Sequence, residues 1–230
     1  MNKTLKTILS ILLALAICGL VYAIYESVME PVRFNKDAGA RQKVAIQQLK
    51  DIRDLQVAFK SVNNHFTASF DSLKQFYDKG QMTVLMQVGS RDDSLAVAHT
   101  EAVKKANKGI KDADLFRMYQ AGDKNLVFSV QNKINVKDTL FNHRDDFNID
   151  AIGTIPFSEG EPVEMDAIVK KVSGVDVPLF EAKMPFKALF KGLNHQLVVN
   201  MVAERKDQNR YEGLQVGSVT APNNNAGNWE

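Results

Sequence analysis

The sequence predicts an α+β protein that begins with a membrane-spanning helix. Three features support this class: an uncharged apolar run near the N-terminus, an amphipathic segment after it, and a series of short apolar runs separated by turn residues in the second half. Helices followed by strands favour antiparallel sheets over alternating β-α-β units. We therefore expect an N-terminal transmembrane helix, then amphipathic helices, then a mainly antiparallel β C-terminal half.

The apolar run extends from Thr7 to Tyr25 and contains no charged residue. A helix rises about 1.5 Å per residue, so roughly 20 apolar residues cross the hydrocarbon of a bilayer. We predict a membrane anchor over residues 7–29, with residues 7–25 embedded in lipid. The expected lipid-facing side chains are Leu12, Leu13, Leu15, Leu20 and Tyr25.

Two cleavable signals are the alternatives to an anchor. A secretory signal peptide also starts with basic residues, here Lys3 and Lys6, and Val21–Ala23 offers an acceptable cleavage site. Signal peptides have apolar runs of about 7–15 residues, so the longer run here favours a retained anchor, while the sequence alone leaves cleavage open. A lipoprotein signal requires a small residue before Cys18, whereas Ile17 is bulky.

The charges around the anchor predict its orientation. Lys3 and Lys6 lie on a short tail, residues 1–6, and basic residues on such a tail favour the cytoplasmic side. Basic residues also follow the anchor, which weakens this rule. Cys18 is the only cysteine, so the rest of the chain suits an oxidising compartment without a disulfide framework. We expect an inner-membrane protein with its soluble module in the periplasm.

Composition limits the function of the module. The chain has 230 residues, 45% of them hydrophobic, and a formal net charge of +2. About 200 residues remain beyond the anchor, enough for one or two compact domains. A near-neutral balance argues against a nucleic-acid partner, which requires a strongly basic surface.

After the anchor, Pro31 is expected to break the helix, which makes residues 30–39 a connector. Residues 40–122 are predicted to be helical with one short strand. A helix over residues 40–63 carries apolar residues at alternating three- and four-residue spacing, which lays one stripe along its surface. This stripe either packs on the protein's own sheet or forms a partner interface, and its candidate interface residues are Ile52, Leu55, Phe59, Val62 and Phe66.

Shorter elements complete the helical region. Asn63 and Asn64 end the long helix, and Ser69 or Asp71 caps a short helix that runs to Tyr77. A strand is expected over residues 82–88, a polar turn over 91–94, and an amphipathic helix or extended arm over 95–110.

The region of residues 123–221 is predicted to be rich in β-strands. Short apolar runs bounded by turn residues indicate strands at 126–130, 134–136, 147–157, 163–169, 177–184, 197–203 and 214–219, with a helical turn at 186–193. Residues 222–230 form a polar tail, in which Trp229 is expected to fold back onto the module.

The stretch LKDIRDLQVAFKSVNNHFTASFDSLKQFY, residues Leu49–Tyr77, resembles the soluble part of the long N-terminal helix of type IV pilins and type II secretion pseudopilins. In that family an apolar helix continues into an amphipathic one, and a turn leads to a short helix with a pattern like Ser69, Leu73 and Phe76. The resemblance covers about an eighth of the chain. The family's glycine cleavage site, phenylalanine and glutamate have no counterpart at Thr7–Tyr25, so pilin-type processing is not expected.

The whole chain is also similar to uncharacterised Bacteroides-type envelope proteins with a single anchor. The shared features are the anchor, a helix like Leu49–Arg53, and a tail like Gly213–Ser218 followed by Asn223–Trp229. This resemblance implies an envelope location and no particular activity.

The residues show no strong signature of catalysis or metal binding. His65, His99, His143 and His195 are far apart in sequence, so no pair has the i, i+4 spacing of helical metal ligands. No glycine-rich phosphate loop or nucleophile elbow occurs. We expect no cofactor.

A weak calcium candidate consists of Asp146, Asn148 and Asp150, whose alternate oxygens suit a hard cation. Ala151 and Phe157 stand where an EF-hand loop needs glycine and glutamate. In a strand the same alternation places the polar residues on the solvent face, and we favour that interpretation.

The sequence thus predicts a non-enzymatic, membrane-anchored envelope protein. Its module would assemble with other envelope or secretion- and pilus-like components, or with itself. A tethered module that binds or senses a ligand or the cell wall is the first alternative, and a divergent hydrolase is the second. The expected partners are the lipid bilayer and envelope proteins.

Overall fold

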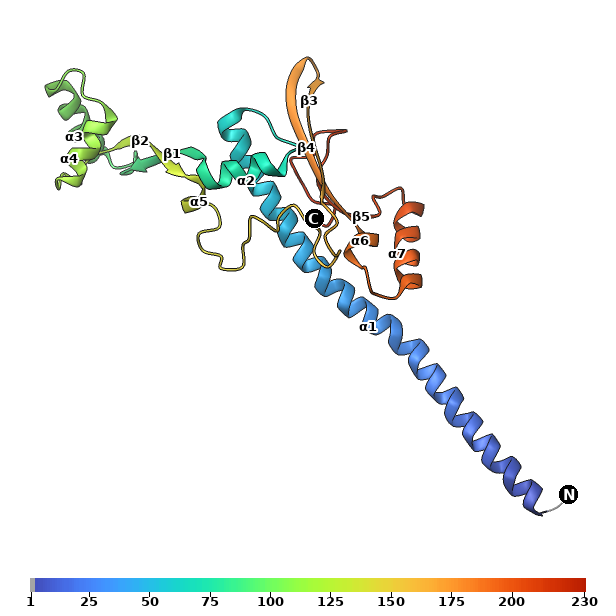
Figure 1. Cartoon of the computed structure of the whole chain (residues 1–230). Helices are drawn as coiled ribbons and strands as arrows, with labels where there is room; N and C mark the ends of the chain where they lie inside the picture. The colour runs from blue at the N-terminus through green and yellow to red at the C-terminus, as the bar shows by residue number, and fades with distance from the viewer. Residues whose placement is uncertain (1–2) are drawn as a thin grey trace. The chain divides into compact units, whose positions relative to one another are not determined.

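A computed structural model describes residues 3–230 of the chain, with side chains from Ile8 onward (Figure 1). The expected cytoplasmic tail, residues 1–6, therefore lies outside the residues whose side chains are described. The α+β class is confirmed: a long N-terminal helix is followed by shorter helices and antiparallel sheets. The chain divides into two compact units. Unit 1 contains residues 1–54, 66–70 and 148–230, and unit 2, inserted between these segments, contains residues 55–65 and 71–147.

Helix α1 extends without a break over Lys3–Asn63, with Pro31 inside it. The prediction of a connector at residues 30–39 is therefore wrong. A proline inside a helix removes one hydrogen bond and costs about 3 kcal/mol. Phe34 and Ala38, which follow it by one and two turns, are buried in unit 1, and this burial offsets the cost only if the helix continues.

The second half of α1 carries the buried stripe of the molecule. Its buried apolar residues recur at spacings of three, four and seven, which places them on one face of the helix. Fully burying each large apolar side chain stabilises the fold by about 1.5–3 kcal/mol. The buried residues are Phe34, Ala38, Ala45, Leu49 and Ile52 in unit 1, and Leu55 and Ala58 in unit 2.

Unit 1 contains a three-stranded antiparallel sheet in the order β3-β4-β5. The strands are β3 (Glu164–Val172), β4 (Val175–Pro185) and β5 (Gly213–Gly217). Alternate residues point to one buried face, as the period of a strand requires. The ring centroid of Phe66 lies 4.7 Å from that of Phe180 on this sheet. The apolar residues buried on this face are Phe180, Ala182, Met184, Leu214 and Val216, and Leu179 and Glu181 of β4 are buried on the opposite face.

Two helices follow β4, namely α6 (Phe186–Leu189) and α7 (His195–Asp207), and both lie beside α1 in Figure 1. The prediction of a strand at residues 197–203 is wrong. Its valines favour a strand, but the Asn194 side chain accepts a hydrogen bond from the Leu197 N–H at 3.0 Å and caps a helix there. Val198 and Val202, one turn apart, are buried.

The strand expected at residues 147–157 is also wrong, because this segment forms a series of turns. The Gln48 side chain of α1 donates hydrogen bonds to the carbonyls of Ala151, Ile152 and Thr154 at 3.2, 2.8 and 2.8 Å. Backbone polar groups need partners when water is excluded. Gln48 connects these turns to α1, and the Ile155 N–H donates within the segment to the Glu161 carbonyl at 2.8 Å.

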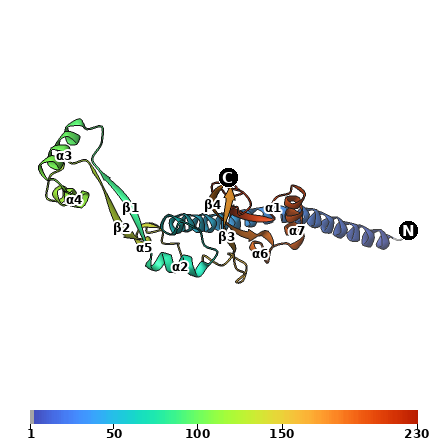
Figure 2. The same cartoon turned by 90° about the horizontal axis from the view of Figure 1, so that it is seen from above.

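Unit 2 contains the ribbon of β1 (Gln81–Val88) and β2 (Phe128–Asn135), which pair antiparallel. Helices α3 (Ser94–Ala106) and α4 (Asp112–Gln120) lie at one end of this ribbon in Figure 2, and α2 (Phe70–Lys79) and α5 (Val136–Thr139) lie at the other. The predicted strand at 82–88 and the helix within 95–110 are confirmed, whereas the two strands expected at 126–130 and 134–136 are one continuous strand.

A small core holds the ribbon end of unit 2 together. It consists of Val88, Leu115, Leu126, Phe128 and Val130, with partly buried side chains from α3 and α4 around it. Two local interactions define α3: Asp93 accepts hydrogen bonds from the N–H groups of Leu95 and Ala96, both at 3.1 Å, and begins the helix. The Thr100 hydroxyl donates to the Ala96 carbonyl at 2.7 Å and accepts from the Val127 N–H at 2.8 Å.

The buried stripe of α1 yields a stability prediction. Leu49→Ala should lower the free energy of unfolding of unit 1 by about 2–5 kcal/mol, because it leaves a cavity at a fully buried position. Val44→Ala, on an exposed face of the same helix, should change it by about 0.5 kcal/mol or less. Denaturant titration followed by the fluorescence of Trp229, the single tryptophan, measures both values. Equal losses in the two variants would contradict the assignment.

Candidate functional site

The first feature of functional interest is the apolar segment of α1 from Ile8 to Val28. Its large apolar side chains are exposed, including the predicted anchor residues Leu12, Leu13, Leu15, Leu20 and Tyr25, which are 53–65% exposed. Within residues 3–230, α1 is the one helix long and apolar enough to cross a membrane. A contiguous apolar surface of this extent marks an interaction site or a membrane segment.

The folded module begins directly after this segment. Phe34 is buried, and its ring centroid lies 6.2 Å from that of Phe190. The Asn194 side chain donates a hydrogen bond to the Glu30 carboxylate, still closer to the apolar segment. Because α1 is unbroken, only about 9 Å of helix separates Val28 from the first buried ring. Unit 1 is therefore connected to the apolar segment by continuous helix and not by a loop.

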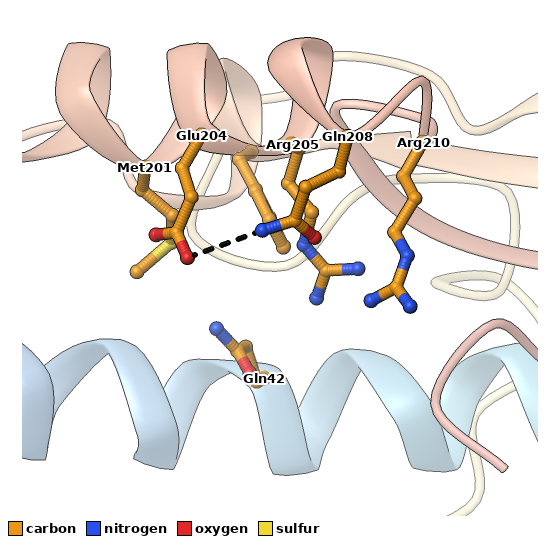
Figure 3. Close-up of a pocket in the computed structure, with 7 residues that line it drawn as sticks. Gln42, Met201, Glu204, Arg205, Gln208 and Arg210 are labelled. Atoms are coloured by element: carbon orange, nitrogen blue, oxygen red, sulfur yellow. Dashed lines mark hydrogen bonds between the residues drawn. The ribbon is translucent and has the colours of Figure 1, made fainter.

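The second feature is a polar groove along α1 and α7, which we call the arginine groove. It consists of two clefts of about 370 Å³ each, and both are lined by Arg205 and Arg210. In Figure 3 the two arginine side chains extend from α7 and the segment after it toward α1, where Gln42 lies. The first cleft is lined by Gln42, Phe186, Met201, Glu204, Gln208 and the two arginines, and the second by Tyr211, Gln215, Asn228, Trp229, Glu230 and the two arginines.

The two arginines at the centre of the groove are not neutralised. The Arg205 guanidinium lies over the Phe186 ring, 5.6 Å from its centroid. Among residues 8–230, no carboxylate lies within 4.0 Å of either guanidinium. Of the two acidic residues in the lining, Glu204 accepts a hydrogen bond from Gln208 at 3.4 Å, and Glu230 pairs with Arg53 at 2.7 Å. The hydrogen bond from Arg53 lowers the pKa of the Glu230 carboxyl.

Two polar atoms in the groove wall are buried without a hydrogen-bond partner in the described part of the chain, namely the Tyr211 hydroxyl and Trp229 Nε1. Burial raises the pKa of Tyr211, and nearby carboxylates, among them Glu164 and Glu181, raise it further. The phenol therefore stays protonated and remains a donor at physiological pH. A buried polar atom without a partner costs about 1–3 kcal/mol.

The rings of Tyr211 and Trp229 are held close to glycines. A Cβ at Gly227 would lie 2.4 Å from two atoms of the Trp229 ring, and one at Gly213 would lie 2.9 Å from Cε1 of Tyr211. The second position is also closed by backbone, because the Met184 carbonyl oxygen would lie 2.3 Å away. These positions require glycine for close approach, and they fix both aromatic rings in the groove wall.

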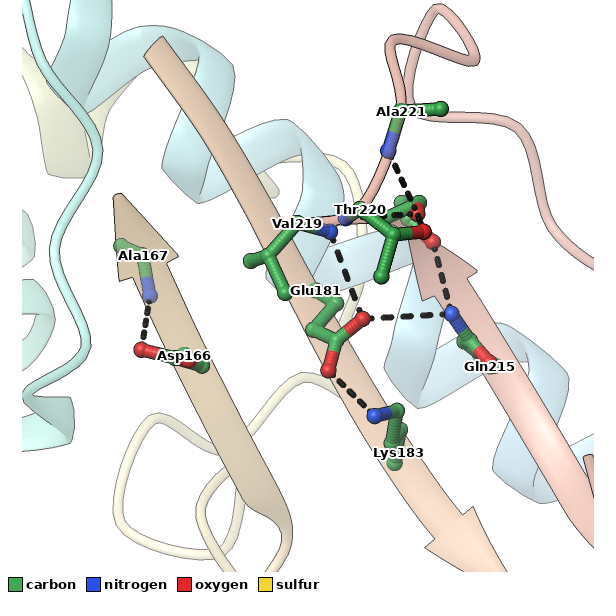
Figure 4. A network of polar contacts seen from close by, with 10 residues as sticks. Asp166, Ala167, Glu181, Lys183, Gln215, Val219, Thr220 and Ala221 are labelled. Atoms are coloured by element: carbon green, nitrogen blue, oxygen red, sulfur yellow. Dashed lines mark hydrogen bonds and ion pairs between the residues drawn. The ribbon is translucent and has the colours of Figure 1, made fainter. Parts of the chain in front are cut away.

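A polar network positions the C-terminal segment that carries Trp229 (Figure 4). Buried Glu181 pairs with Lys183 and accepts hydrogen bonds from the Gln215 side chain at 3.4 Å and the Val219 N–H at 3.3 Å. Beyond it, Asn228 donates to the Gly213 carbonyl at 2.9 Å and accepts from the Gln215 N–H at 3.1 Å. The predicted polar tail thus lies along β5, and Trp229 folds back onto unit 1.

The predicted interface stripe is not an open surface. Ile52, Leu55 and Phe66 are buried within the chain, because the module uses this face of α1 for its own core. Phe59 is half-buried and its ring centroid lies 5.3 Å from that of Phe76. Of the five residues only Val62 is exposed. The alternative interpretation, that the stripe packs on the protein itself, describes its buried members.

The calcium candidates do not lie on a strand. Arg144 donates two hydrogen bonds to the Asp146 carboxylate, at 3.0 and 2.8 Å, and lowers the pKa of that carboxyl. The Asn148 side chain accepts from the Asp150 N–H at 2.9 Å and forms a local turn. Among the described residues, no group of three or more histidine, cysteine or acidic side chains has the arrangement of a metal site.

Two of the four histidines make contacts that the structure defines. His99 Nε2 lies 2.8 Å from a carboxylate oxygen of Asp123, and this hydrogen bond lowers the pKa of Asp123. The hydroxyl of the next residue, Thr100, is already bonded to backbone groups on both sides. The His65 ring packs edge-on to Phe59, with centroids 5.7 Å apart. The hydroxyl beside His99 is therefore engaged by the backbone, and the ring beside His65 is not a nucleophile.

Sequence reasoning missed the arginine groove. Arg205 and Arg210 are five residues apart, and Trp229 follows much later, so their convergence depends on how α7 and β5 pack. The one feature of the sequence that could have indicated the groove is the single tryptophan, Trp229, close to Gly227. No family model, curated protein or solved structure matches the chain. Function is therefore inferred from the chain's own geometry.

The unpartnered hydroxyl of Tyr211 gives a testable result. Tyr211→Phe should leave the free energy of unfolding at pH 7 unchanged or raise it by about 1 kcal/mol, because it removes a buried polar atom without a partner. The folded state holds the phenol proton more tightly than the unfolded chain, so the wild type loses stability as the pH rises above 10.0, the unperturbed pKa of tyrosine.

Tyr211→Phe should show a smaller loss of stability over the same range. Denaturant titrations of both proteins at pH 7, 9, 10 and 11 cover the range in which an ordinary tyrosine ionises, at about pH 10. They measure the difference between the two losses of stability. A clear destabilisation of Tyr211→Phe at pH 7 would mean that the hydroxyl has a partner.

Proposed function

We propose that this chain is a single-pass membrane protein whose module assembles with other proteins of the bacterial envelope. The observation that carries the proposal is the continuity of α1, in which an exposed apolar segment runs directly into the buried stripe of unit 1. In this proposal residues 7–25 lie in the bilayer, the N-terminus is cytoplasmic, and the module lies in the periplasm.

The helical junction favours assembly over free capture of soluble molecules. A flexible linker lets a tethered domain search a volume, whereas a continuous helix holds it at one distance from the membrane. Such a module loses little orientational freedom when it binds another membrane protein, which reduces the entropic cost of association. The junction from Val28 to Phe34 has this property.

Unit 2 supplies exposed apolar side chains for such contacts. Leu85 on the ribbon is 62% exposed, and Leu95 at the start of α3 is 82% exposed. The ribbon consists of β1 and β2, and each strand pairs with the other through one edge. A two-stranded ribbon is marginally stable alone, and its outer edges can accept another strand.

The resemblance of Leu49–Tyr77 to pilin and pseudopilin helices directs the proposal toward secretion- or pilus-like assemblies. A non-enzymatic role is supported by the His99–Asp123 pair, which is partly exposed and lies beside a threonine hydroxyl engaged by the backbone. A second candidate function, a tethered ligand-binding module, is favoured by the two unneutralised arginines of the arginine groove.

Anchoring predicts how the protein behaves in membranes. Leu15→Arg places a charge near the middle of the apolar segment, at a cost of roughly 2.5–3.5 kcal/mol for a spanning helix. We expect the variant to be released from membranes by an alkaline carbonate wash that leaves the wild type in the pellet.

Val44→Arg, on an exposed part of the same helix outside the apolar segment, is the matched control and should stay in the pellet. Release of the wild type and the control would contradict anchoring. A reporter enzyme that is active only in the periplasm, fused after Glu230, tests orientation: an inactive but well-expressed fusion contradicts the proposed topology.

Assembly predicts a specific contact at unit 2. A photo-activated cross-linking side chain in place of Leu95 should give a defined larger species in native membranes. The same group in place of Lys108, an exposed polar position in unit 2, should not. Migration of the protein as a monomer after irradiation at both positions would count against assembly through this unit.

A further inference from the structure

The arginine groove has the features of a binding site for an anion. Two guanidiniums line both of its clefts without a carboxylate within 4.0 Å in residues 8–230. Of the two acidic side chains of the lining, Glu230 is paired with Arg53, whereas Glu204 accepts a hydrogen bond from the neutral Gln208 amide, so in the first cleft two arginines face one unpaired carboxylate. Guanidinium groups pair with carboxylates through two parallel hydrogen bonds, which makes them selective for this group.

We propose that the arginine groove binds an extended acidic peptide segment of a partner protein. Arg205 and Arg210 hold acidic side chains of the peptide at the centre of the groove. On one side Gln42 and Gln208 line the wall, and on the other side Gln215 and Asn228 do so. Gln208, Gln215 and Asn228 are hydrogen-bonded within the protein, whereas the Gln42 amide has no hydrogen bond to another described residue. The Gln42 amide can therefore donate to and accept from the backbone of a peptide.

The size of the groove favours a chain over a small ion. A cleft of about 370 Å³ extends on each side of the arginines, and both clefts share them. A single phosphate or acetate would occupy only a small part of this space, since pockets for larger ligands start at about 300 Å³. A peptide that crosses the two guanidiniums fills both clefts.

The position of the groove along α1 argues against a lipid headgroup. Gln42 lies roughly 21 Å of helix beyond Val28, the end of the exposed apolar segment. The interfacial layer of a bilayer adds only about 5–7 Å beyond the hydrocarbon on each side. Lipid headgroups therefore lie well short of the groove when residues 7–25 span the membrane.

The groove wall also presents two aromatic rings to an occupant. The side chains of Tyr211 and Trp229 line the second cleft, and their rings offer apolar contact area to the methylene groups of glutamate side chains. The Tyr211 hydroxyl and Trp229 Nε1 are themselves buried inside the protein, so the peptide contacts the rings and not these two donors.

The peptide would belong to a protein that assembles with this one, so its source rests on the proposed function, whereas its binding in the groove does not. Trp229 is the single tryptophan and lines the groove, so its fluorescence reports occupancy directly. Full-length protein in mild detergent is titrated with acetylated hexaglutamate amide. We expect a saturable change in emission, weakened about tenfold or more in the double variant Arg205→Gln/Arg210→Gln.

Lys206→Gln is the matched control, because it removes a positive charge from the same helix without altering the groove lining. It should bind the peptide as the wild type does. The double variant Arg205→Lys/Arg210→Lys keeps the charge and loses the paired hydrogen bonds, so it should bind with intermediate strength. Unchanged thermal unfolding of each variant excludes a folding defect, and the lysine variant serves if the glutamine variant does not fold.

Three outcomes would overturn the proposal. The first is the absence of a saturable change, and the second is a change of equal strength in the glutamine double variant. The third is an equal or larger response to inorganic phosphate, to acetylated hexaglutamine amide or to vesicles containing phosphatidylglycerol, which would point to another ligand class. None of these outcomes bears on anchoring or on the cross-link at Leu95, so failure here is distinguishable from failure of the proposed function.

Discussion

The structure depends on one continuous helix, α1. Its first part is the exposed apolar segment, and its later part contributes buried residues to the core of unit 1. Pro31 sits between these parts and costs about 3 kcal/mol of helix stability. Burial of Phe34, Leu49 and Ile52 exceeds this cost, at about 1.5–3 kcal/mol for each large side chain. The helix therefore continues through the proline, and the buried stripe of unit 1 follows the apolar segment on the same helix.

Polar side chains of the same helix hold segments that have little regular structure. Gln48 binds three carbonyls of the turns after Asn148, and Arg41 donates to the carbonyls of Leu189 and Lys191 at 3.2 and 2.8 Å at the end of α6. Arg53 pairs with Glu230 near the end of the described chain. Each contact provides a partner for a carbonyl or carboxylate group that is not hydrogen-bonded within a sheet or helix. These three residues connect α1 to segments that come much later in the sequence.

The arginine groove and the apolar segment both involve α1. The lining of the groove includes Gln42 of α1, the helix whose first part is the exposed apolar segment. Its wall is held by the Glu181 network and by Asn228, which place Trp229 beside the two arginines. The proposed anchoring and the proposed binding of an acidic peptide are compatible with each other, because they use different parts of α1.

The sequence by itself determined the features that depend on local pattern: the uncharged run that forms the apolar part of α1, the α+β class, and strands such as β1, β3 and β4, whose alternation and bounding turns are visible in the residues. Tertiary structure decided whether Pro31 ended the helix, whether residues 197–203 formed a strand or α7, and where the turns after Phe147 found hydrogen-bond partners. It also placed Ile52 and Leu55 in the core and brought Arg205, Arg210 and Trp229 together. These outcomes depend on burial and on partners distant in sequence, such as Gln48, and a local pattern of residue types contains no information about which distant group will supply them.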